Sequence, residues 1–223
     1  MTPYRGAPTL GEELRAWRSG YRHVAGVDEV GRGPMAGPVV AGAVILDPQF
    51  AGEWWAELRD SKLISSAQRT ELSDRLLGTA ACSTGSASND EIDDLGLIVA
   101  TRLAMLRALE GLPCQPQLLL IDALALPHVL APEAGPAESA WEQRALIHGD
   151  TLSASIAAAS IVAKVSRDGL MDEYDRQYPD YGFGQHKGYC TVDHIRALAE
   201  HGPCAVHRRS FAPVRAYLER GEA

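Results

Sequence analysis

The sequence has few cysteines and no long apolar run. Its four cysteines are far apart and form no Cys-x-x-Cys pair, which argues against a zinc site and does not match a disulfide framework. They are Cys82, Cys114, Cys190 and Cys204. Residues Met1–Gly11 contain no apolar core typical of a signal peptide, and no apolar run is long enough to span a bilayer. These absences predict a cytoplasmic protein that is not associated with a membrane.

The sequence also lacks an excess of positive charge. It has 29 acidic and 21 basic residues, and the formal net charge of −8 disfavours non-specific binding of a polyanion by the whole surface. A local basic patch is still compatible with this balance. The hydrophobic fraction of 46% is sufficient for a folded core, and a length of 223 residues (1–223) predicts a single domain.

What the sequence does contain is a pair of apolar runs around a segment rich in glycine, proline and charge. The runs are Val24–Val27 and Val39–Leu46, and their lengths and boundaries predict two buried strands joined by a turn or hairpin. Asp28 and Glu29 lie where the first strand is expected to end. A buried carboxylate without a partner is destabilising, and bound cations would remove that cost. The pair could equally be a solvated strand end.

The loop after this acidic pair is suited to an anion. Gly31-Arg32-Gly33-Pro34 offers main-chain N–H groups that no side chain shields, together with one guanidinium, and such a set suits a phosphate. A dinucleotide-binding fingerprint matches poorly, because its third glycine, Gly37, comes one position late. Pro34 and Pro38 would interrupt the helix that the fingerprint requires, and a strand follows instead.

Periodicity and capping signals predict the remaining elements. Helices are expected over Gly11–Gly20, from a capping box at Ser65 to Gly78, from Ser88 to Gly111, from Leu152 to about Tyr174, from Thr191 to His201 and from Pro213 onward. Strands are expected over Ala80–Ala87, Gln117–Ile121 and Ala145–Ile147. Pro127–Ser139 is expected to be a loop, and Tyr178–Tyr189 to be irregular.

Two further carboxylates, Asp122 and Asp150, each follow a predicted strand. With Asp28 and Glu29 they would meet at one edge of the sheet, where open α/β folds place their sites. Four carboxylates held together cannot all stay ionised without cations, and an oxygen-only set of ligands favours Mg²⁺ or Mn²⁺ over Zn²⁺. The pattern therefore predicts a two-ion site for phosphodiester chemistry. Alternatively, Asp122 begins a turn and Asp150 caps a helix.

The stretch from His186 to Arg215 reverses the overall charge balance. It has five basic residues against two acidic ones, which makes it the best candidate for a surface that contacts a phosphate backbone. The expected contacts there are Lys187, Arg208 and Arg209. Lys62, in the loop before a predicted helix, is a further candidate. Each of these basic residues could equally be solvated and without a ligand.

Five blocks of the sequence occur in a recognisable order: VDEVGRGPMAGPVVAGAVIL, LLIDALALP, IHGDTLSASIAAASIVAKVSRD, YGFGQHKGYCT and HRRSF. Together they resemble ribonuclease HII, the type 2 ribonuclease H, from about residue 21 to residue 217. The resemblance implies an α/β, ribonuclease H-like fold with a mixed five-stranded sheet flanked by helices. Residues 21–177 would form the catalytic core, and residues 178–223 a small C-terminal helical part that contacts the substrate.

The resemblance also implies an activity. This is endonucleolytic cleavage of the RNA strand of RNA–DNA hybrids, and cleavage 5′ to single ribonucleotides in duplex DNA, by a monomer. Two-metal hydrolysis with Mg²⁺ or Mn²⁺ would leave 3′-hydroxyl and 5′-phosphate ends, in ribonucleotide removal and primer processing. The family carboxylates fall on Asp28, Glu29, Asp122 and Asp150.

Two further elements would recognise the ribonucleotide. The loop Gly31-Arg32-Gly33 resembles the element that reads the 2′-hydroxyl and adjoining phosphates through main-chain groups, where glycine permits close approach. Tyr189 resembles the tyrosine that stacks on the neighbouring sugar. The 2′-hydroxyl is the group that separates RNA from DNA at a single position.

Three positions depart from the family pattern. Ala123 stands where most relatives have glycine, and Gly96 stands where they have asparagine. The segment Asp60-Ser61-Lys62-Leu63 has one lysine where relatives have two. No carboxylate is lost. Asp168 matches a common family position that does not bind metal, and it is expected to join a network of ion pairs.

Three other functions compete with this interpretation. A related nuclease that needs a run of ribonucleotides would not cut at a lone one. A non-catalytic nucleic-acid-binding module would keep its function when Asp28 is replaced by asparagine. An enzyme that binds a nucleotide through the glycine-rich loop would be stabilised by that nucleotide.

Overall fold

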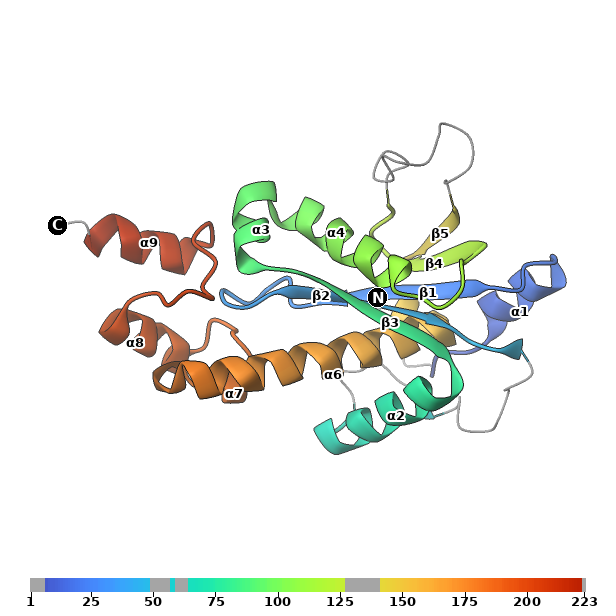
Figure 1. Cartoon of the computed structure of the whole chain (residues 1–223), viewed down its shortest axis with the longest axis horizontal. Coiled ribbons are helices and arrows are strands. Elements are labelled where there is room, and N and C mark those ends of the chain that lie inside the picture. The colour runs from blue at the N-terminus through green and yellow to red at the C-terminus, as the bar shows by residue number, and fades with distance from the viewer. Residues whose placement is uncertain (1–6, 49–56, 59–63, 127–140, 222–223) are drawn as a thin grey trace, which may run out of the picture.

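The fold is built around one mixed sheet of five strands. The computed structural model describes residues 7–48, 57–58, 64–126 and 141–221. The strands lie in the order β3-β2-β1-β4-β5 (Figure 1). They are β1 (Val24–Val30), β2 (Val39–Ile45), β3 (Ala81–Ala87), β4 (Leu118–Asp122) and β5 (Glu142–Leu146). The mixed five-stranded sheet expected from the sequence is therefore confirmed.

Strand direction sets which residues share an edge of this sheet. The hairpin predicted from the two apolar runs is confirmed, because β1, β2 and β3 form an antiparallel meander. By contrast, β4 and β5 run parallel to β1. The carboxyl ends of β1, β4 and β5 consequently lie at the same edge of the sheet.

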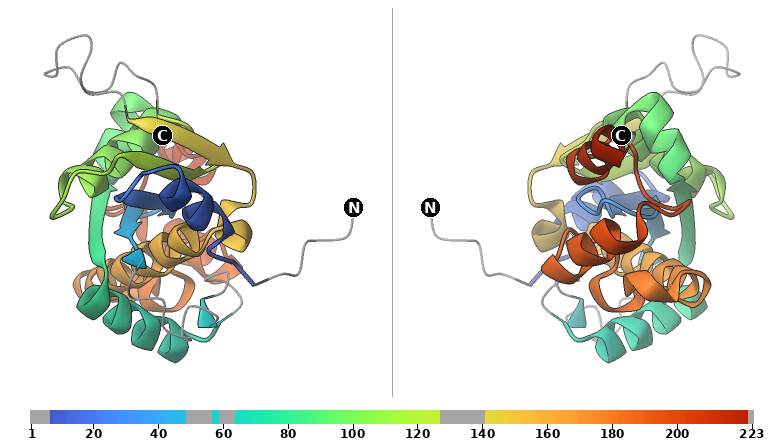
Figure 2. Two further views of the ribbon diagram at one scale, coloured as in Figure 1. Left: turned by 90° about the vertical axis from the view of Figure 1, so that its right-hand side faces the viewer. Right: turned by 90° about the vertical axis from the view of Figure 1, so that its left-hand side faces the viewer.

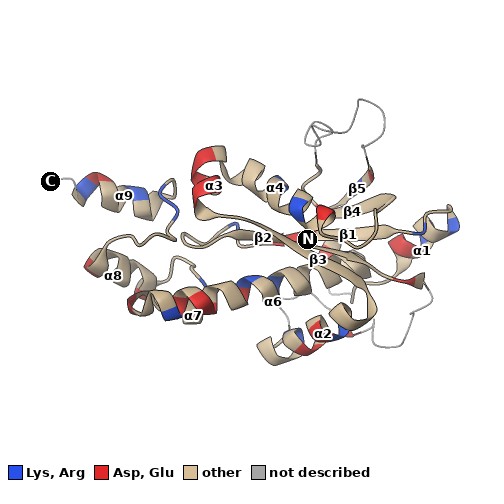
Figure 3. Ribbon diagram, viewed as in Figure 1, with Lys and Arg blue, Asp and Glu red and all other residues tan. Residues whose placement is uncertain are grey.

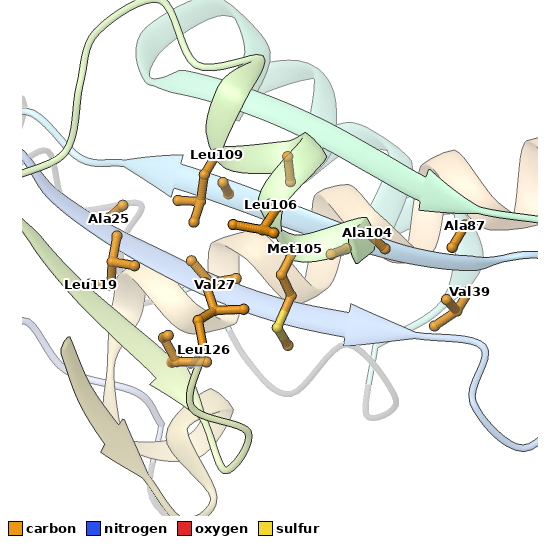
Figure 4. Packing of buried hydrophobic residues seen from close by; sticks show 14 of the residues in the cluster. Ala25, Val27, Val39, Ala87, Ala104, Met105, Leu106, Leu109, Leu119 and Leu126 are labelled. Carbon is orange, nitrogen blue, oxygen red and sulfur yellow. The ribbon is translucent and has the colours of Figure 1, made fainter. Parts of the chain in front are cut away.

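Helices cover both faces of the sheet. On one face lies α4 (Leu97–Glu110), which packs on β2 and β3, and on the other lies α6 (Ala154–Gln177), which packs on β1 and β2 (Figure 1). The core beneath α4 includes Val27, Met105 and Leu119 (Figure 4). Val24 belongs to the cluster on the α6 side instead. The side chains of β1 thus alternate between the two faces, as in any regular strand.

α6 approaches the sheet unusually closely, because glycines stand at the points of contact. A Cβ atom on Gly26 would lie 2.1 Å from the carbonyl carbon of Ser155. A Cβ atom on Gly42 would lie 2.3 Å from the main-chain oxygen of Ala159. The backbone of α6 therefore touches β1 and β2 directly, and the position of every side chain on α6 is fixed relative to these strands.

Capping interactions fix the ends of several helices. The capping box predicted at Ser65 is confirmed, with Gln68 as its partner, and it begins α2 (Ser66–Thr79). At the N-terminus of α6, the buried Glu13 of α1 (Gly11–Arg18) accepts hydrogen bonds from the hydroxyls of Ser153 and Ser155. A carboxylate at this end of a helix interacts favourably with the helix dipole. Glu13 therefore joins α1 to α6.

Beyond α6 the chain forms the small helical part expected from the sequence. Its elements are η4 (Pro179–Tyr181), α7 (Phe183–His186), α8 (Val192–His201) and α9 (Ala212–Gly221). The segment Tyr178–Tyr189 is thus more regular than predicted, since it contains η4 and α7. These helices gather at one end of the sheet (Figure 2). Phe183 packs there with Ala36 and Met171, which attaches this part to the core.

Two predicted helices are interrupted. The helix expected from Ser88 to Gly111 breaks at Gly96, whose φ is +79°, into α3 (Asn89–Leu95) and α4. The apolar period continues across the break, so periodicity alone did not reveal it. The helix expected from Leu152 is also divided. Gly149–Leu152 forms the short α5, and α6 begins after Ser153, whose side chain caps it.

The last strand was placed too far along the chain. The sequence-based expectation was Ala145–Ile147, whereas β5 covers Glu142–Leu146. This strand lies at the edge of the sheet and is half polar, so it lacks the apolar run that marks a buried strand. Lys62 and the Pro127–Ser139 loop lie outside the described residues. Within the described part of the chain, no helix is long and apolar enough to cross a membrane.

The contact between α6 and the sheet makes a testable prediction. Gly26→Ala should lower the free energy of unfolding by about 1–3 kcal/mol or more. The new methyl group would collide with the backbone of α6, which cannot rotate away as a side chain could. Gly78→Ala is the matched control, since Gly78 lies in α2 with no atom within 4 Å of the added methyl group. This control should be stabilised by roughly 0.5–1 kcal/mol. Urea denaturation of both variants measures the difference. Equal stability of Gly26→Ala and the wild type would contradict the direct contact.

Candidate active site

Asp28 and Glu29 lie within the last three residues of β1 and point to opposite faces of the sheet. Asp28 is on the α6 side, where it forms a hydrogen bond with the side chain of Ser160. Only 6% of Asp28 is exposed. The main-chain N–H of Glu29 donates to the Asp28 carboxylate at 2.8 Å. Asp28 is therefore held in one orientation by a helix and by its own strand. Nothing in the sequence pattern singled out Ser160, which is one of many small residues on α6.

Asp122, the last residue of β4, lies beside Asp28 because the two strands are parallel. Their register pairs Val27 with Ile121, so the next residue of each strand is an aspartate. The Asp122 carboxylate accepts a hydrogen bond of 2.9 Å from the N–H of Gly149, the first residue of α5. Asp150 follows directly and is buried. Asp28, Glu29 and Asp122 are thus brought to one edge of the sheet by the ends of two strands, and Asp150 follows in a short helix whose first N–H binds Asp122.

The turn after Asp122 departs from the geometry that most residues prefer. Ala123 has a φ of +52°, in the left-handed region. An L-residue other than glycine in this region costs roughly 1–2 kcal/mol, which accounts for the glycine expected here. The N–H of Ala123 nevertheless donates to the carbonyl oxygen of Leu146 in β5 at 3.1 Å. The turn therefore forms with alanine, and Asp122 keeps its place.

The electrostatics of this edge disfavour the ionised forms of Asp28 and Glu29. Burial raises the pKa of Asp28 well above its ordinary value, and the nearby charges of Glu29 and Asp122 raise it further. Burial also raises the pKa of Glu29, while Arg32 lowers it through a hydrogen bond of 3.1 Å. The second carboxylate oxygen of Glu29 is buried and has no hydrogen-bond partner within the described residues. A cation at this edge would relieve all of these costs.

The donor set fits a hard divalent cation. Its side chains offer only carboxylate oxygens, the ligands that Mg²⁺ and Mn²⁺ prefer. Across residues 7–48, 57–58, 64–126 and 141–221, no three His, Cys, Asp or Glu side chains are already grouped at metal-binding distances. The carboxylates therefore share an edge without forming a closed ligand cage. Such an arrangement suits ions that also bind the substrate and water.

The glycine-rich loop lies directly after this acidic edge. Gly31 has a φ of +92°, and a Cβ atom on it would lie 2.1 Å from Nε of Arg167, so no other residue fits there. Arg208 was expected to contact a phosphate of the substrate. That expectation is wrong for a direct contact, because Arg208 is fully buried and donates its hydrogen bonds to carbonyl oxygens of Gly31, Arg32 and Gly37.

Tyr189 stands next to the loop with its ring at the surface. It is 45% exposed, and a Cβ atom on Gly33 would lie 3.6 Å from Cε1 of its ring. The main-chain oxygen of Tyr189 accepts a hydrogen bond of 2.9 Å from Nδ1 of His194. The loop and the tyrosine, which are far apart in the sequence, therefore form one surface beside the carboxylates.

Two buried histidines fix the backbone of Tyr189, and sequence analysis did not single them out. The N–H of Cys204 donates to Nδ1 of His207 at 3.0 Å, so the His207 proton is on Nε2. That Nε2 donates to Nε2 of His194 at 3.1 Å, and Nδ1 of His194 donates to Tyr189. Sγ of Cys204 also lies 3.1 Å from Nδ1 of His207. This chain of hydrogen bonds needs one proton on each ring, so both rings are neutral. Burial is the main cause that lowers the pKa of each histidine to about 4.

The remaining basic candidates lie close to acidic groups. Lys187 is half-buried and its ammonium forms an ion pair with Asp172. The Arg209 residue is exposed, and its main-chain N–H donates a hydrogen bond of 2.7 Å to the carboxylate of Asp93 in the acidic helix α3 (Figure 3). Asp168 forms the expected network of ion pairs, with Lys164 and Arg69. Neighbouring acids therefore weaken the positive field of the C-terminal stretch.

Comparison with known proteins decides the family. The family model described as Ribonuclease HII matches residues 25–214. The chain belongs to the ribonuclease HII family. The ribonuclease HII of Desulfitobacterium hafniense is 50% identical over 211 residues, which cover 94% of this chain and 76% of that relative. Membership makes this chain a type 2 ribonuclease H, a hydrolase that cuts its substrate internally.

Solved structures of similar fold agree with the architecture. The ribonuclease H2 of Pyrococcus horikoshii OT3 has a TM-score of 0.72 and 24% identity, over 89% of this chain and 98% of that one. Bst-RNase HIII, solved in complex with Mn²⁺, has a TM-score of 0.66 and 17% identity, over 94% of this chain and 73% of that one. The ribonuclease H-like fold inferred from the sequence is confirmed.

The buried histidine pair predicts a loss of stability in acid. The pKa of each histidine is about 4 in the folded protein and about 6.5 in the unfolded chain, so the unfolded chain binds protons first as the pH falls. The free energy of unfolding should therefore fall between pH 6.5 and 4, by at most about 1.4 kcal/mol per pH unit for each histidine. Urea denaturation at several pH values measures the slope.

The slope should be smaller in His194→Gln, which removes one of the two buried rings. His201→Gln is the control, because the His201 side chain is exposed at the surface. An unchanged slope in His194→Gln would contradict the assignment of both rings as neutral.

Replacing a carboxylate of the acidic edge should weaken metal binding without lowering the stability of the metal-free protein. Asp28→Asn removes a buried charge that Glu29 and Asp122 disfavour, so the metal-free protein should be at least as stable as the wild type at pH 8. The variant should also lose most of the rise in melting temperature that Mg²⁺ or Mn²⁺ gives the wild type. Asp74→Asn, on the exposed side of α2, is the control and should change neither quantity. A full metal-dependent rise in Asp28→Asn would show that the ions bind elsewhere.

Proposed function

We propose that this type 2 ribonuclease H cleaves the RNA strand of RNA–DNA hybrids and also cuts 5′ to single ribonucleotides in duplex DNA. The products would carry 3′-hydroxyl and 5′-phosphate ends. The observation that carries the proposal is the position of Gly31–Gly33 and Tyr189, which form one surface directly beside the carboxylates. A site that reads one ribose needs its recognition surface and its reacting groups within one nucleotide of each other.

In this proposal the four carboxylates hold two divalent ions, either Mg²⁺ or Mn²⁺. They are Asp28, Glu29, Asp122 and Asp150. Bound ions would supply a nucleophilic water and neutralise the charge that develops on the leaving 3′-oxygen. Bst-RNase HIII, which shares the fold, binds Mn²⁺ in its solved complex. Ser160 supports this role by fixing the orientation of Asp28, and the Gly149 N–H does the same for Asp122.

The loop and Tyr189 would provide selectivity. Main-chain groups of Gly31–Gly33 approach the 2′-hydroxyl and its phosphates, since no side chain on either glycine blocks them. The exposed ring of Tyr189 packs on the adjoining deoxyribose. A duplex of DNA alone would bind through its phosphates without being cut. Lys62, Lys187 and Arg209 would add contacts to the backbone.

The biological setting follows from the substrate. Removal of ribonucleotides from DNA, and processing of RNA primers, both need an incision at a junction of RNA and DNA. We place the protein in the cytoplasm as a monomer that acts in replication and repair.

The decisive test uses an end-labelled DNA duplex that contains one ribonucleotide. The wild type should make a single cut 5′ to that ribonucleotide with Mg²⁺ or Mn²⁺, and none with EDTA or with an all-DNA duplex. Asp28→Asn should lower kcat by at least roughly 100-fold, the cost of losing one electrostatic group at a reacting centre. Cutting of a continuous hybrid but not of the single-ribonucleotide duplex would leave a nuclease that needs a run of ribonucleotides.

Tyr189 provides a second test of selectivity. Tyr189→Ala should lower kcat/KM on the single-ribonucleotide duplex by about 5- to 150-fold, as expected for the loss of one stacked aromatic ring. Tyr189→Phe is the matched control, because it keeps the ring and should retain most of the activity. A continuous hybrid offers further contacts and should be cut with a smaller loss. An equal fall in kcat/KM on both substrates would argue against a role of Tyr189 in recognising the junction of RNA and DNA.

A further inference from the structure

Two arginines are buried behind the glycine-rich loop. Arg167 of α6 and Arg208 before α9 are both 0% exposed. Among the described residues, every hydrogen bond that either guanidinium donates goes to a main-chain carbonyl oxygen. Buried charges are normally paired with opposite charges, because desolvation is costly. In the part of the chain that the structure describes, neither arginine forms an ion pair, so two such cations beside an exposed loop require a reason.

Arg208 is held in one orientation against the loop. Its Nη2 lies 2.6 Å from the oxygen of Gly31, its Nη1 lies 3.1 Å from the oxygen of Arg32, and its Nε lies 2.9 Å from the oxygen of Gly37. Phe211 covers the guanidinium, with 5.0 Å between Cζ and the ring centroid. The planar fork of an arginine donates from three separate nitrogen atoms in a fixed geometry, whereas a lysine donates from a single nitrogen.

This contact determines where the N–H groups of the loop point. The described peptide bonds are all trans, and in a trans peptide group the C=O and N–H bonds point in opposite directions. Since Arg208 holds the carbonyls of Gly31 and Arg32 inward, the N–H groups of Arg32 and Gly33 point away from it. Both of these residues are exposed, and neither N–H donates a hydrogen bond within the described part of the chain. The loop thus presents two adjacent donors beside Tyr189.

The buried charge also strengthens these donors. A cation at the carbonyl end of a peptide group polarises it and makes its N–H end more positive. Two consecutive N–H groups that point the same way form a site for an anion, and a site fixed in advance needs no reorganisation when the anion arrives. Burial is the main cause that lowers the pKa of Arg208 to about 9, the charge of Arg167 contributes to this, and Asp93 opposes it, so a further anion near the loop would stabilise the cationic form.

We propose that Arg208 is a positioning residue of the substrate site, which turns the N–H groups of Arg32 and Gly33 toward a phosphate oxygen of the nucleic acid. This inference rests on the proposed function and names the group that prepares its loop. Arg208 therefore does not touch the phosphate, and it affects phosphate binding only through the orientation of the loop.

Arg167 provides a matched comparison. It is equally buried, and it also donates to three carbonyl oxygens, those of Ala36, Pro38 and Lys187. Two of those peptide groups already use their N–H, however. Gly37 donates to Val206, and Gly188 donates to Nδ1 of His186. Replacing Arg167 should therefore destabilise the fold without removing a donor from the substrate.

The test compares Arg208→Met with Arg167→Met on the single-ribonucleotide duplex, below the melting temperature of both variants. Arg208→Met should raise KM by about 10- to 100-fold and change kcat by less than about threefold, because it weakens a preorganised pair of donors and touches no reacting atom. Arg167→Met should lose a similar amount of thermal stability with a much smaller rise in KM. An unchanged KM in Arg208→Met, or an equal rise in both variants, would overturn the proposal.

A measurement on the wild type keeps the test valid if Arg208→Met does not fold. An all-DNA duplex, which is not cut, is titrated into ¹⁵N-labelled protein, and the amide protons of Arg32 and Gly33 should show the largest downfield shifts. Arg208→Lys, which keeps the charge but donates from one nitrogen instead of three, should show smaller shifts. Amides that do not move in the wild type would overturn the positioning role. Failure of the wild type to cut the single-ribonucleotide duplex would instead refute the proposed function.

Discussion

The direct contact between α6 and the backbone of β1 and β2 is the constraint on which the site depends. Because Gly26 and Gly42 lack side chains, the backbone of the helix touches both strands at these two positions. Ser160 then reaches Asp28, and Arg167, two turns further along, reaches the loop that follows β1. One rigid helix therefore orients the acidic edge and supports the end of the loop at Pro38, whereas Arg208 binds the carbonyl groups at the start of the loop.

The site places opposite charges on two sides of a very short piece of chain. Asp28 and Glu29 are acidic groups at the end of a buried strand, and Arg208 is a buried cation behind the loop that begins at Gly31. Each is unfavourable without a ligand. In the proposed complex, divalent ions would neutralise the acids while a phosphate faces the loop, so metal and substrate would favour each other's binding. The buried charges lower the stability of the folded protein at this edge, but they form a site that is arranged before the ligands bind.

The sequence predicts the parts of this site that follow from local pattern. Asp28 and Asp122 end apolar runs, and strand direction brings such ends together, so their proximity was predictable. The role of Arg208 was not, because a basic residue in a basic stretch looks the same whether it is solvated or buried. The His194–His207 pair also depends on tertiary contacts between segments with no shared pattern. The break at Gly96 was missed because the apolar period continues across it.

The polar sequence of β5 has a consequence for how copies of the protein meet. An edge strand exposes unpaired N–H and C=O groups, which can recruit a strand from another chain and begin aggregation. β5 carries Glu142 and Arg144, whose side chains are 51% and 36% exposed, and charges on an edge strand oppose such pairing. The same polar residues that hid this strand from an analysis of hydrophobic pattern therefore oppose the pairing of its edge with a strand of another copy.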